Sequence, residues 1–324
     1  MAHPTLPAGI IKMMASRAHR VHHLLWHAVR SGWLFYDNPT RVAITALGWA
    51  PPRPALRPGP NGAEIIYDNA SGEDFLYMHR EMIGAVNKRL GEIGDAAYPR
   101  ITAWPEPPPA TDADWPVPPA FSVGDPPTDA YIAECKSEKF YHERLMAWAG
   151  SYRTPATLRS LTLGELGARI EFTIHNRMHM RWCAPISQMR PDSDPATPDT
   201  IDAKWDALSY DWLGDTYSSH VHPTFWKLHG WVDVCIDHWA RANNVSGPIP
   251  WKGTWTGPFP SAPPHHSIFA EMLAIRAARE LSEPAHDHGG HDAHHLATMI
   301  KVAKLVQASG IACHFYDPIF VEEI

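Results

Sequence analysis

The stretch from Thr162 to Trp182 is TLGELGARIEFTIHNRMHMRW, and its pattern decides the predicted fold. Its first four residues, Thr162-Leu163-Gly164-Glu165, form a capping-box pattern, which predicts that a helix begins here. His175 and His179 lie four residues apart near its end, so on a helix both imidazoles project from one face. Such a pair can bind a transition metal when a third ligand approaches from another segment. The alternative is two polar residues on a helix surface.

Helical patterns recur along the chain and strand signals are few, which predicts a mainly α-helical fold. Pro223 suits the first turn of one of these helices, and Ser71 is a possible cap of another. Four helices are expected to form a four-helix bundle core within a single domain covering residues 1–324. The predicted bundle helices span residues 9–31, 74–90, 162–182 and 223–242. Another helix is predicted at residues 129–149, and two more, at 266–282 and 292–308, form a C-terminal addition over 266–308.

Proline-rich segments separate some of these helices. Residues 99–127 contain PEPPPA and WPVPPA, which predict a long extended loop that wraps the core. Residues 37–72 are rich in Pro and Gly and are expected to be irregular, apart from a short strand at residues 42–47. Residues 184–221 are expected to be loop with some local helix.

The composition excludes several functional classes. The 324 residues carry a formal net charge of −7 and no run of Lys or Arg, so nucleic acid is not an expected partner. No apolar run approaches the roughly 20 residues that span a bilayer, so no membrane partner is expected. The cysteines form no CxxC motif and are expected to be reduced thiols of a cytoplasmic protein. The unusual feature is the 21 histidines, which a functional hypothesis has to explain.

Several histidines lie in apolar surroundings on the predicted bundle helices. His229 is embedded in PTFWKLHGWVD, where a buried imidazole needs partners for its polar atoms, and Asp233 could orient it. His79 lies in FLYMHRE, on the inward face of its helix. The alternative for both is a buried histidine bonded to a carboxylate. On the first helix, His19, His23 and His27 form a stripe at helical spacing, and His22 lies beside it. The alternative for these histidines is a solvated helix face.

Imidazole ligands without carboxylates suit copper or zinc. Di-iron centres in helical bundles normally use several Glu residues and a Glu-x-x-His motif, and no such pair is found on facing helices. A zinc hydrolase is disfavoured because the chain has no HExxH motif and no evident Glu base.

Three of these segments resemble motifs of the type-3 dicopper family of tyrosinases, catechol oxidases and haemocyanins, and they follow one another along the chain in the same order as in that family. Phe75–Glu81 resembles the family's FLPWHR segment, which supplies a ligand of the first copper. His175-Asn176-Arg177-Met178-His179 resembles the HNxxH segment of the second copper site. Pro223–Asp233 resembles the P-x-F-W-x-x-H-x-x-V-D segment, which supplies the third ligand of that site. The resemblance implies two copper ions, each held by three histidines, with O2 bound between them.

For the second copper the resemblance carries over His175, His179 and His229. It also implies a catalytic role for Asn176, because tyrosinases that accept monophenols use an Asn here, with a water held by a Glu, to help deprotonate the phenol. Glu165 is expected to supply that carboxylate, with Glu171 as the alternative. The alternative for Asn176 is an ordinary helix-surface amide.

For the first copper only His79 carries over directly. In the family, another ligand usually lies about nine residues before the one that matches His79, but here that position is Ala70. The other two ligands of the first copper are therefore expected from the first helix. That helix offers a pair at helical spacing, as in arthropod haemocyanins, and we choose His23 and His27. The substitutes are His19 and His22.

The resemblance implies a copper-dependent oxidoreductase that uses O2 to ortho-hydroxylate or oxidise a small phenol, catechol or aminophenol. The alternatives are a non-catalytic protein that binds O2 or metal, and a variant that holds a single copper or zinc. The C-terminal CHFYDPIFVEEI is aromatic and is expected to cover the site, as placeholder segments do in this family. His220 and His222 are open between supporting the ligands from a second shell, lining the substrate entrance and having no role at the site. The late His-rich turn is open between binding or relaying metal and being a solvated loop: His286, His288, His291, His294 and His295.

Overall fold

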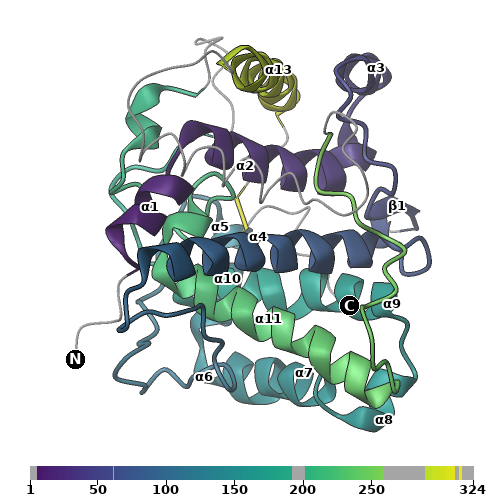
Figure 1. Ribbon diagram of the computed structural model, residues 1–324, viewed down its shortest axis with the longest axis vertical. Coiled ribbons are helices and arrows are strands. Elements are labelled where there is room, and N and C mark those ends of the chain that lie inside the picture. The colour runs from purple at the N-terminus through teal and green to yellow at the C-terminus, as the bar shows by residue number, and fades with distance from the viewer. Residues whose placement is uncertain (1–5, 61, 192–200, 259–288, 311–313, 316–324) are drawn as a thin grey trace.

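The computed structural model describes residues 6–60, 62–191, 201–258, 289–310 and 314–315. The fold is mainly helical, as predicted (Figure 1). One large cluster of buried apolar side chains connects helices from both ends of the described chain, so these segments share a core.

The predicted helix over residues 9–31 is two helices, α1 (Ala8–Met14) and α2 (Arg17–Gly32). The break lies at Ser16, where a ψ of 141° is extended rather than helical. The hydroxyl of Ser16 shares a 2.8 Å hydrogen bond with Nδ1 of His19, so local side-chain bonding supports the new helix start. All the histidines of the predicted stripe lie on α2.

The expected strand at residues 42–47 is wrong, because most of this segment belongs to α3 (Asn38–Ala46). Asp37 caps the helix by accepting a 2.8 Å hydrogen bond from the backbone N–H of Thr40. This cap, with a proline in the first turn, outweighs the β propensity of the apolar residues.

Short elements connect the main helices. The strands of the described chain, β1 (Leu56–Gly59) and β2 (Gly62–Ile65), form one antiparallel hairpin. A single 3₁₀ turn spans Trp33–Phe35. Two more, Ala203–Asp206 and Ser219–Val221, agree with the local helix expected within 184–221.

The other three predicted bundle helices are confirmed with shifted ends. The capping box is present, with Thr162 and Glu165 each bonded to the other's backbone. The proposed cap at Ser71 is wrong, because Ala70, with a left-handed φ of 62°, precedes the helix and Ser71 is its first residue. The elements are α4 (Ser71–Ile93), α9 (Leu163–Ile170), a π-helical turn (Glu171–His175), α10 (Asn176–Trp182) and α11 (Pro223–Ala242).

The helix predicted at residues 129–149 is interrupted at Ser137, whose side chain caps the following turn. The elements in this region and directly after it are α5 (Pro126–Lys136), α6 (Glu138–Phe140), a π-helical turn (Tyr141–Leu145), α7 (Met146–Ser151) and α8 (Pro155–Arg159).

The helix predicted at 292–308 is confirmed as α13 (Gly289–Ala308), whereas the one predicted at 266–282 lies outside the described residues.

Glycines allow α4 and α9 to approach each other closely. A Cβ on Gly72 would lie 2.1 Å from the carbonyl oxygen of Gly164, and one on Gly167 would lie 2.0 Å from the carbonyl oxygen of Gly72. No side chain fits in either place, so backbone packs directly on backbone. This contact sets the distance between the helices that carry His79 and His175.

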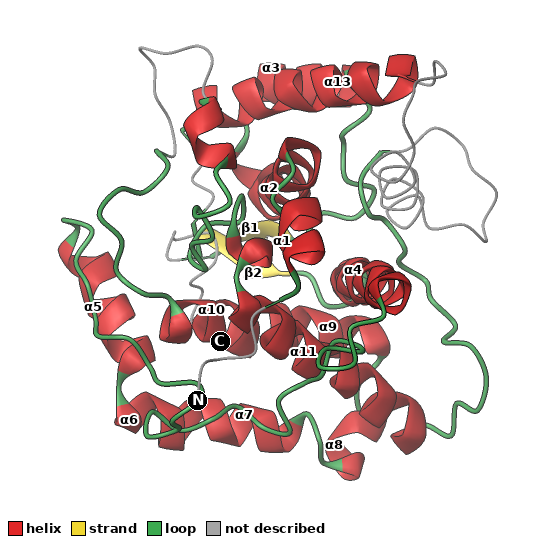
Figure 2. Cartoon of the chain, turned by 60° about the vertical axis from the view of Figure 1, so that its left-hand side comes forward, coloured by secondary structure: helices red, strands yellow, loops and turns green. Residues whose placement is uncertain are grey.

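The histidine-bearing segments lie in the middle of the molecule. Helices α3 and α13 lie on one side, above α2, while α6, α7 and α8 lie at the opposite side (Figures 1 and 2). Helices α4, α9, α10 and α11 lie between these layers, so their inward side chains are shielded from solvent. In the described part of the chain, no helix has the length and apolar character needed to cross a membrane.

Candidate metal centre

Six buried histidines from four helical segments meet in the core, and they are the six that the sequence predicted as ligands. Each side chain is at most 1% exposed. Helix α2 contributes two, α4 one, the π-helical turn and α10 two, and α11 one. The six are His23, His27, His79, His175, His179 and His229.

Their ring nitrogens form two compact groups that could hold metal ions, each with ligand atoms within 4.8 Å of one another. The first is the predicted triad of His23, His27 and His79. The second contains His79 with His175 and His229, where the prediction has His179 in place of His79. The ring of His179 lies close to this second group, with its centroid 4.7 Å from that of His175. His79 therefore lies between the two groups.

Hydrogen bonds at Nδ1 orient four of these rings. His79 and His229 each donate to the carbonyl oxygen four residues earlier in the same helix, at 2.8 Å in both cases. His23 donates to the carbonyl of Thr216 at 2.5 Å, and His179 to that of Leu213 at 2.9 Å. Because a carbonyl can only accept, each Nδ1 carries the proton and each Nε2 presents a lone pair, which is the form that binds metal.

Four of the six inward Nε2 atoms have no hydrogen-bond partner among the described residues. Those of His23, His27, His79 and His179 are buried and accept no hydrogen bond from any described residue. A buried imidazole nitrogen without a partner is costly, so these atoms are expected to bind something that the polypeptide does not supply.

The Nε2 atoms of His175 and His229 lie 3.0 Å apart. Nδ1 of His175 donates to Oδ1 of Asn176 at 2.8 Å, and Nδ1 of His229 donates to a carbonyl, so neither Nε2 carries a proton in the neutral ring. Two lone pairs facing each other repel, and a bound cation would remove the repulsion. The residues present therefore fit a metal ion.

Burial keeps these imidazoles neutral. Desolvation lowers the pKa of His23 to about 4 and holds the pKa of the other five well below 6.5. At neutral pH the rings are therefore in the state that ligates metal. Neither of the two groups contains a carboxylate. The buried Glu171 forms a bidentate ion pair with Arg30.

The structure does not bring Glu165 to the histidines. Its carboxylate accepts a 2.7 Å hydrogen bond from the backbone N–H of Thr162 in the capping box, so it has a structural partner. Glu171, the alternative, is engaged by Arg30. Asn176 does lie at the centre, buried against His175, and is not a helix-surface amide. Its observed contact orients a ligand ring.

The substitutes for the first-helix ligands belong to neither group. His19 bonds Ser16, and the ring of His22 packs against Trp49 with the centroids 5.7 Å apart. His220, whose role was left open, is buried and donates from Nε2 to the carbonyl of Met14 at 3.0 Å. Its ring centroid is 4.8 Å from that of His23, so it supports a ligand ring by packing. His286 and His288 lie outside the described residues.

Aromatic rings pack on the ligand imidazoles. Phe225 stacks on His229 with centroids 3.7 Å apart. Phe315, from the C-terminal segment expected to cover the site, stacks on His179 at 3.8 Å and 22°. It also makes edge contacts with His27 and His175. Phe315 is fully buried, so an aromatic ring fits against this face of the centre.

Sequence reasoning missed the residues that hold His23 and His179 in place. The segment Trp212–Tyr217 supplies both carbonyls, and Asp215 within it forms a fully buried ion pair with Arg190. No motif marks a backbone acceptor.

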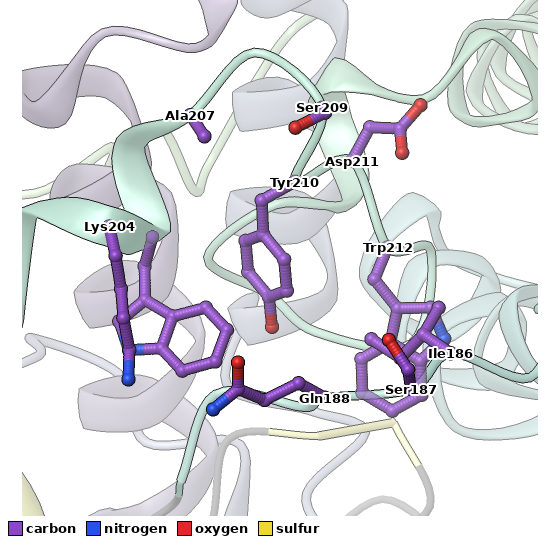
Figure 3. A pocket seen from close by; sticks show the side chains of 10 residues that line it. Ile186, Ser187, Gln188, Lys204, Ala207, Ser209, Tyr210, Asp211 and Trp212 are labelled. Carbon is purple, nitrogen blue, oxygen red and sulfur yellow. The ribbon is translucent and has the colours of Figure 1, made fainter.

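A surface pocket of about 470 Å³ lies on the outer side of this segment (Figure 3). The rings of Trp205, Tyr210 and Trp212 line it. Gln188 and Lys204 line it as well (Figure 3). Because Tyr210 also donates to Asp215 at 2.9 Å, the pocket wall is connected to the segment that anchors the histidines.

No protein-family model matches this chain, and no curated protein is significantly similar to it. The interpretation of the centre therefore depends on its own geometry and on the motifs described above.

Proposed function

We propose that this protein is a type-3 dicopper oxidoreductase that uses O2 to hydroxylate or oxidise a small phenol, catechol or aminophenol. One observation carries the proposal: six buried neutral imidazoles converge from four helical segments, and four of their Nε2 atoms have no hydrogen-bond partner among the described residues. The two groups share His79, so two ions held by them would be close neighbours. Two neighbouring redox-active ions could together supply two electrons to O2, which suits the oxidation of a small molecule.

The donor set favours copper. Imidazole ligands suit copper and zinc, whereas magnesium, calcium and manganese prefer oxygen ligands. Di-iron centres in helical proteins use several carboxylates, and neither histidine group includes one. Copper bound by imidazoles would supply the electrons for O2 reduction and the oxidising power to attack an electron-rich ring.

The protein's own residues would position and protect this chemistry. His23, His27 and His79 would hold the first ion, and His175, His179 and His229 the second. Asn176 keeps the ring of His175 oriented through the 2.8 Å contact. The buried rings around the centre exclude water, which protects a reactive oxidant from quenching. The stacking of Phe315 on His179 supports an aromatic substrate, because a phenol ring could take the same position.

The test is metal analysis and O2 reactivity of the purified full-length chain. We expect about two copper ions per chain, and O2 added to the reduced protein should give a strong near-ultraviolet band. O2 consumption should follow addition of a catechol or an ortho-aminophenol. His229→Ala should lose the band, while His142→Ala, at an exposed position, should retain it. Zinc as the bound metal, or no band with full copper, would contradict the proposal.

A second function, reversible O2 or metal binding without catalysis, is favoured by one observation. Phe315 is buried on the face of the centre where a substrate ring would lie. In a carrier the near-ultraviolet band would form and decay with O2 pressure, and no phenol would be consumed. A single-metal variant would give about one ion per chain and no such band.

A further inference from the structure

Helix α8 lies beside the C-terminal end of α11 (Figure 1). Residues of both helices line a second pocket, which contains none of the six candidate ligand histidines. The pocket has a volume of about 290 Å³. Three arginines and a histidine line it, together with a proline, an alanine and an asparagine, and no acidic residue does so. The basic residues are Arg153, Arg159, His238 and Arg241.

The framework of this pocket is held by hydrogen bonds between the two helices. The side-chain amide of Asn243 donates to the carbonyls of Leu158, at 3.2 Å, and Trp239, at 3.0 Å. The indole N–H of Trp239 donates to the carbonyl of Leu161 at 2.8 Å. These bonds fix the end of α11 against α8, so the arginines extend from a defined backbone.

The arginines have almost no negative partner. Only Arg153 approaches a carboxylate, that of Glu106, at 3.9 Å, and both side chains are more than one third exposed. Arg159 and Arg241 form no ion pair with any described residue. Contact with solvent screens this charge but does not cancel it. The local excess is notable in a chain whose net charge is −7.

Helix ends compensate only part of this charge. Arg159 and Arg241 lie in the last turns of α8 and α11, and Arg153 follows α7, so three helix carboxyl ends lie nearby. A helix end carries at most about half a negative charge, and the short helices α7 and α8 carry less. Three guanidinium groups therefore keep about half or more of their positive charge, and a multiply charged anion would balance it.

We propose that this pocket, lined by Arg153, Arg159 and Arg241, binds a small oxyanion, a phosphate or sulfate group that is free or esterified. Guanidinium groups match the oxygen geometry of phosphate and bind it in bidentate fashion. Nδ1 of His238 has no partner among the described residues and is available to the same ligand. The volume is near the lower limit for ligand pockets, which suits one such group with a small substituent.

The experiment is isothermal titration calorimetry of the full-length, copper-loaded protein with inorganic phosphate, at ionic strength held constant with sodium chloride. Wild-type protein should bind saturably. The double variant R159Q/R241Q should bind at least tenfold more weakly. The matched control K88Q/K139Q removes two exposed cations outside the pocket and should bind as the wild type does.

A parallel titration with phenyl phosphate separates the two sources of the ligand chemistry. Binding tighter than that of inorganic phosphate assigns the pocket to an ester, and equal binding assigns it to the free ion. Copper content and circular dichroism of R159Q/R241Q should equal those of the wild type. Absence of saturable phosphate binding, or unchanged binding in R159Q/R241Q, would overturn the proposal; unchanged binding would indicate that phosphate binds elsewhere, for example at the metal.

Discussion

Two pairs of the candidate ligand histidines are held in place in different ways. His79 and His229 donate from Nδ1 to carbonyls one turn earlier in their own helices, α4 and α11. His23 and His179 donate instead to carbonyls of Thr216 and Leu213, in the segment that precedes α11. The first pair is oriented by local helix geometry, and the second depends on a loop that is distant in sequence.

The difference shows which part of the centre is preformed. A ring bonded within its own helix is positioned once that helix forms, because residues i and i+4 are neighbours on one face. A ring bonded to a distant loop is positioned only when the loop is docked. The loop is held by the buried ion pair of Asp215 and Arg190, with further bonds from Tyr210 and the backbone of Tyr217.

The largest effect is expected from His79, which belongs to both groups. His79→Ala should leave less than one copper ion per chain, whereas His23→Ala should leave about one, because His79 would ligate the first ion and its ring also stacks on His229 of the second, with centroids 4.4 Å apart. Mass spectrometry of the metal content measures both, with His142→Ala as an exposed control. Retention of one full copper in His79→Ala would show that the second ion does not depend on this ring.

Breaking the loop anchor is expected to destabilise the whole fold. Asp215→Asn leaves the guanidinium of Arg190 buried without its counter-charge, which typically costs about 3–5 kcal/mol of unfolding free energy. Copper binding should weaken as well, because both loop-bonded histidines lose support. Urea unfolding measures the loss. Glu64→Gln, at the exposed pair with Arg57, should cost less than about 1 kcal/mol, and an equal loss in both variants would refute the distinction.

Acid should destabilise the metal-free protein through its buried histidines. Burial lowers the pKa of His22 to about 3 and that of His23 to about 4, from an ordinary value near 6.5. The unfolded chain binds these protons near pH 6.5 and the folded protein does not. The unfolding free energy therefore has its full value above about pH 6.5 and decreases as the pH falls below that value. Urea midpoints at about pH 7.5 and about pH 5 should differ accordingly, and equal midpoints would argue against buried neutral rings.

The smallest expected effect concerns Phe315, which stacks on the loop-bonded His179. Phe315→Leu removes the stacked ring while keeping an apolar side chain, so the metal content should not change. Access for a phenol should improve, and kcat/KM for a catechol should rise several-fold. Steady-state O2 consumption measures this change. A drop in copper content would instead mean that Phe315 supports the ligand.

Local patterns predicted much of the fold. The capping box at Thr162 and the helix that follows Pro223 are present because short-range interactions decide them. The failures have equally physical causes. A strand was expected at 42–47 from apolar residues, but the cap at Asp37 favoured a helix. The break at Ser16 depends on a hydroxyl bond that periodicity does not reveal.

The sequence by itself predicted the six histidines that the structure brings together in the core. Imidazoles spaced four apart on helices and FxxxH segments place His175, His179, His79 and His229 on inward faces, whatever the remaining chain does. Only the tertiary structure decided that His79 is shared by the two groups and that Glu165 belongs to neither of them. The reason is that register between helices depends on contacts such as that of Gly72 with Gly167, which no single segment encodes.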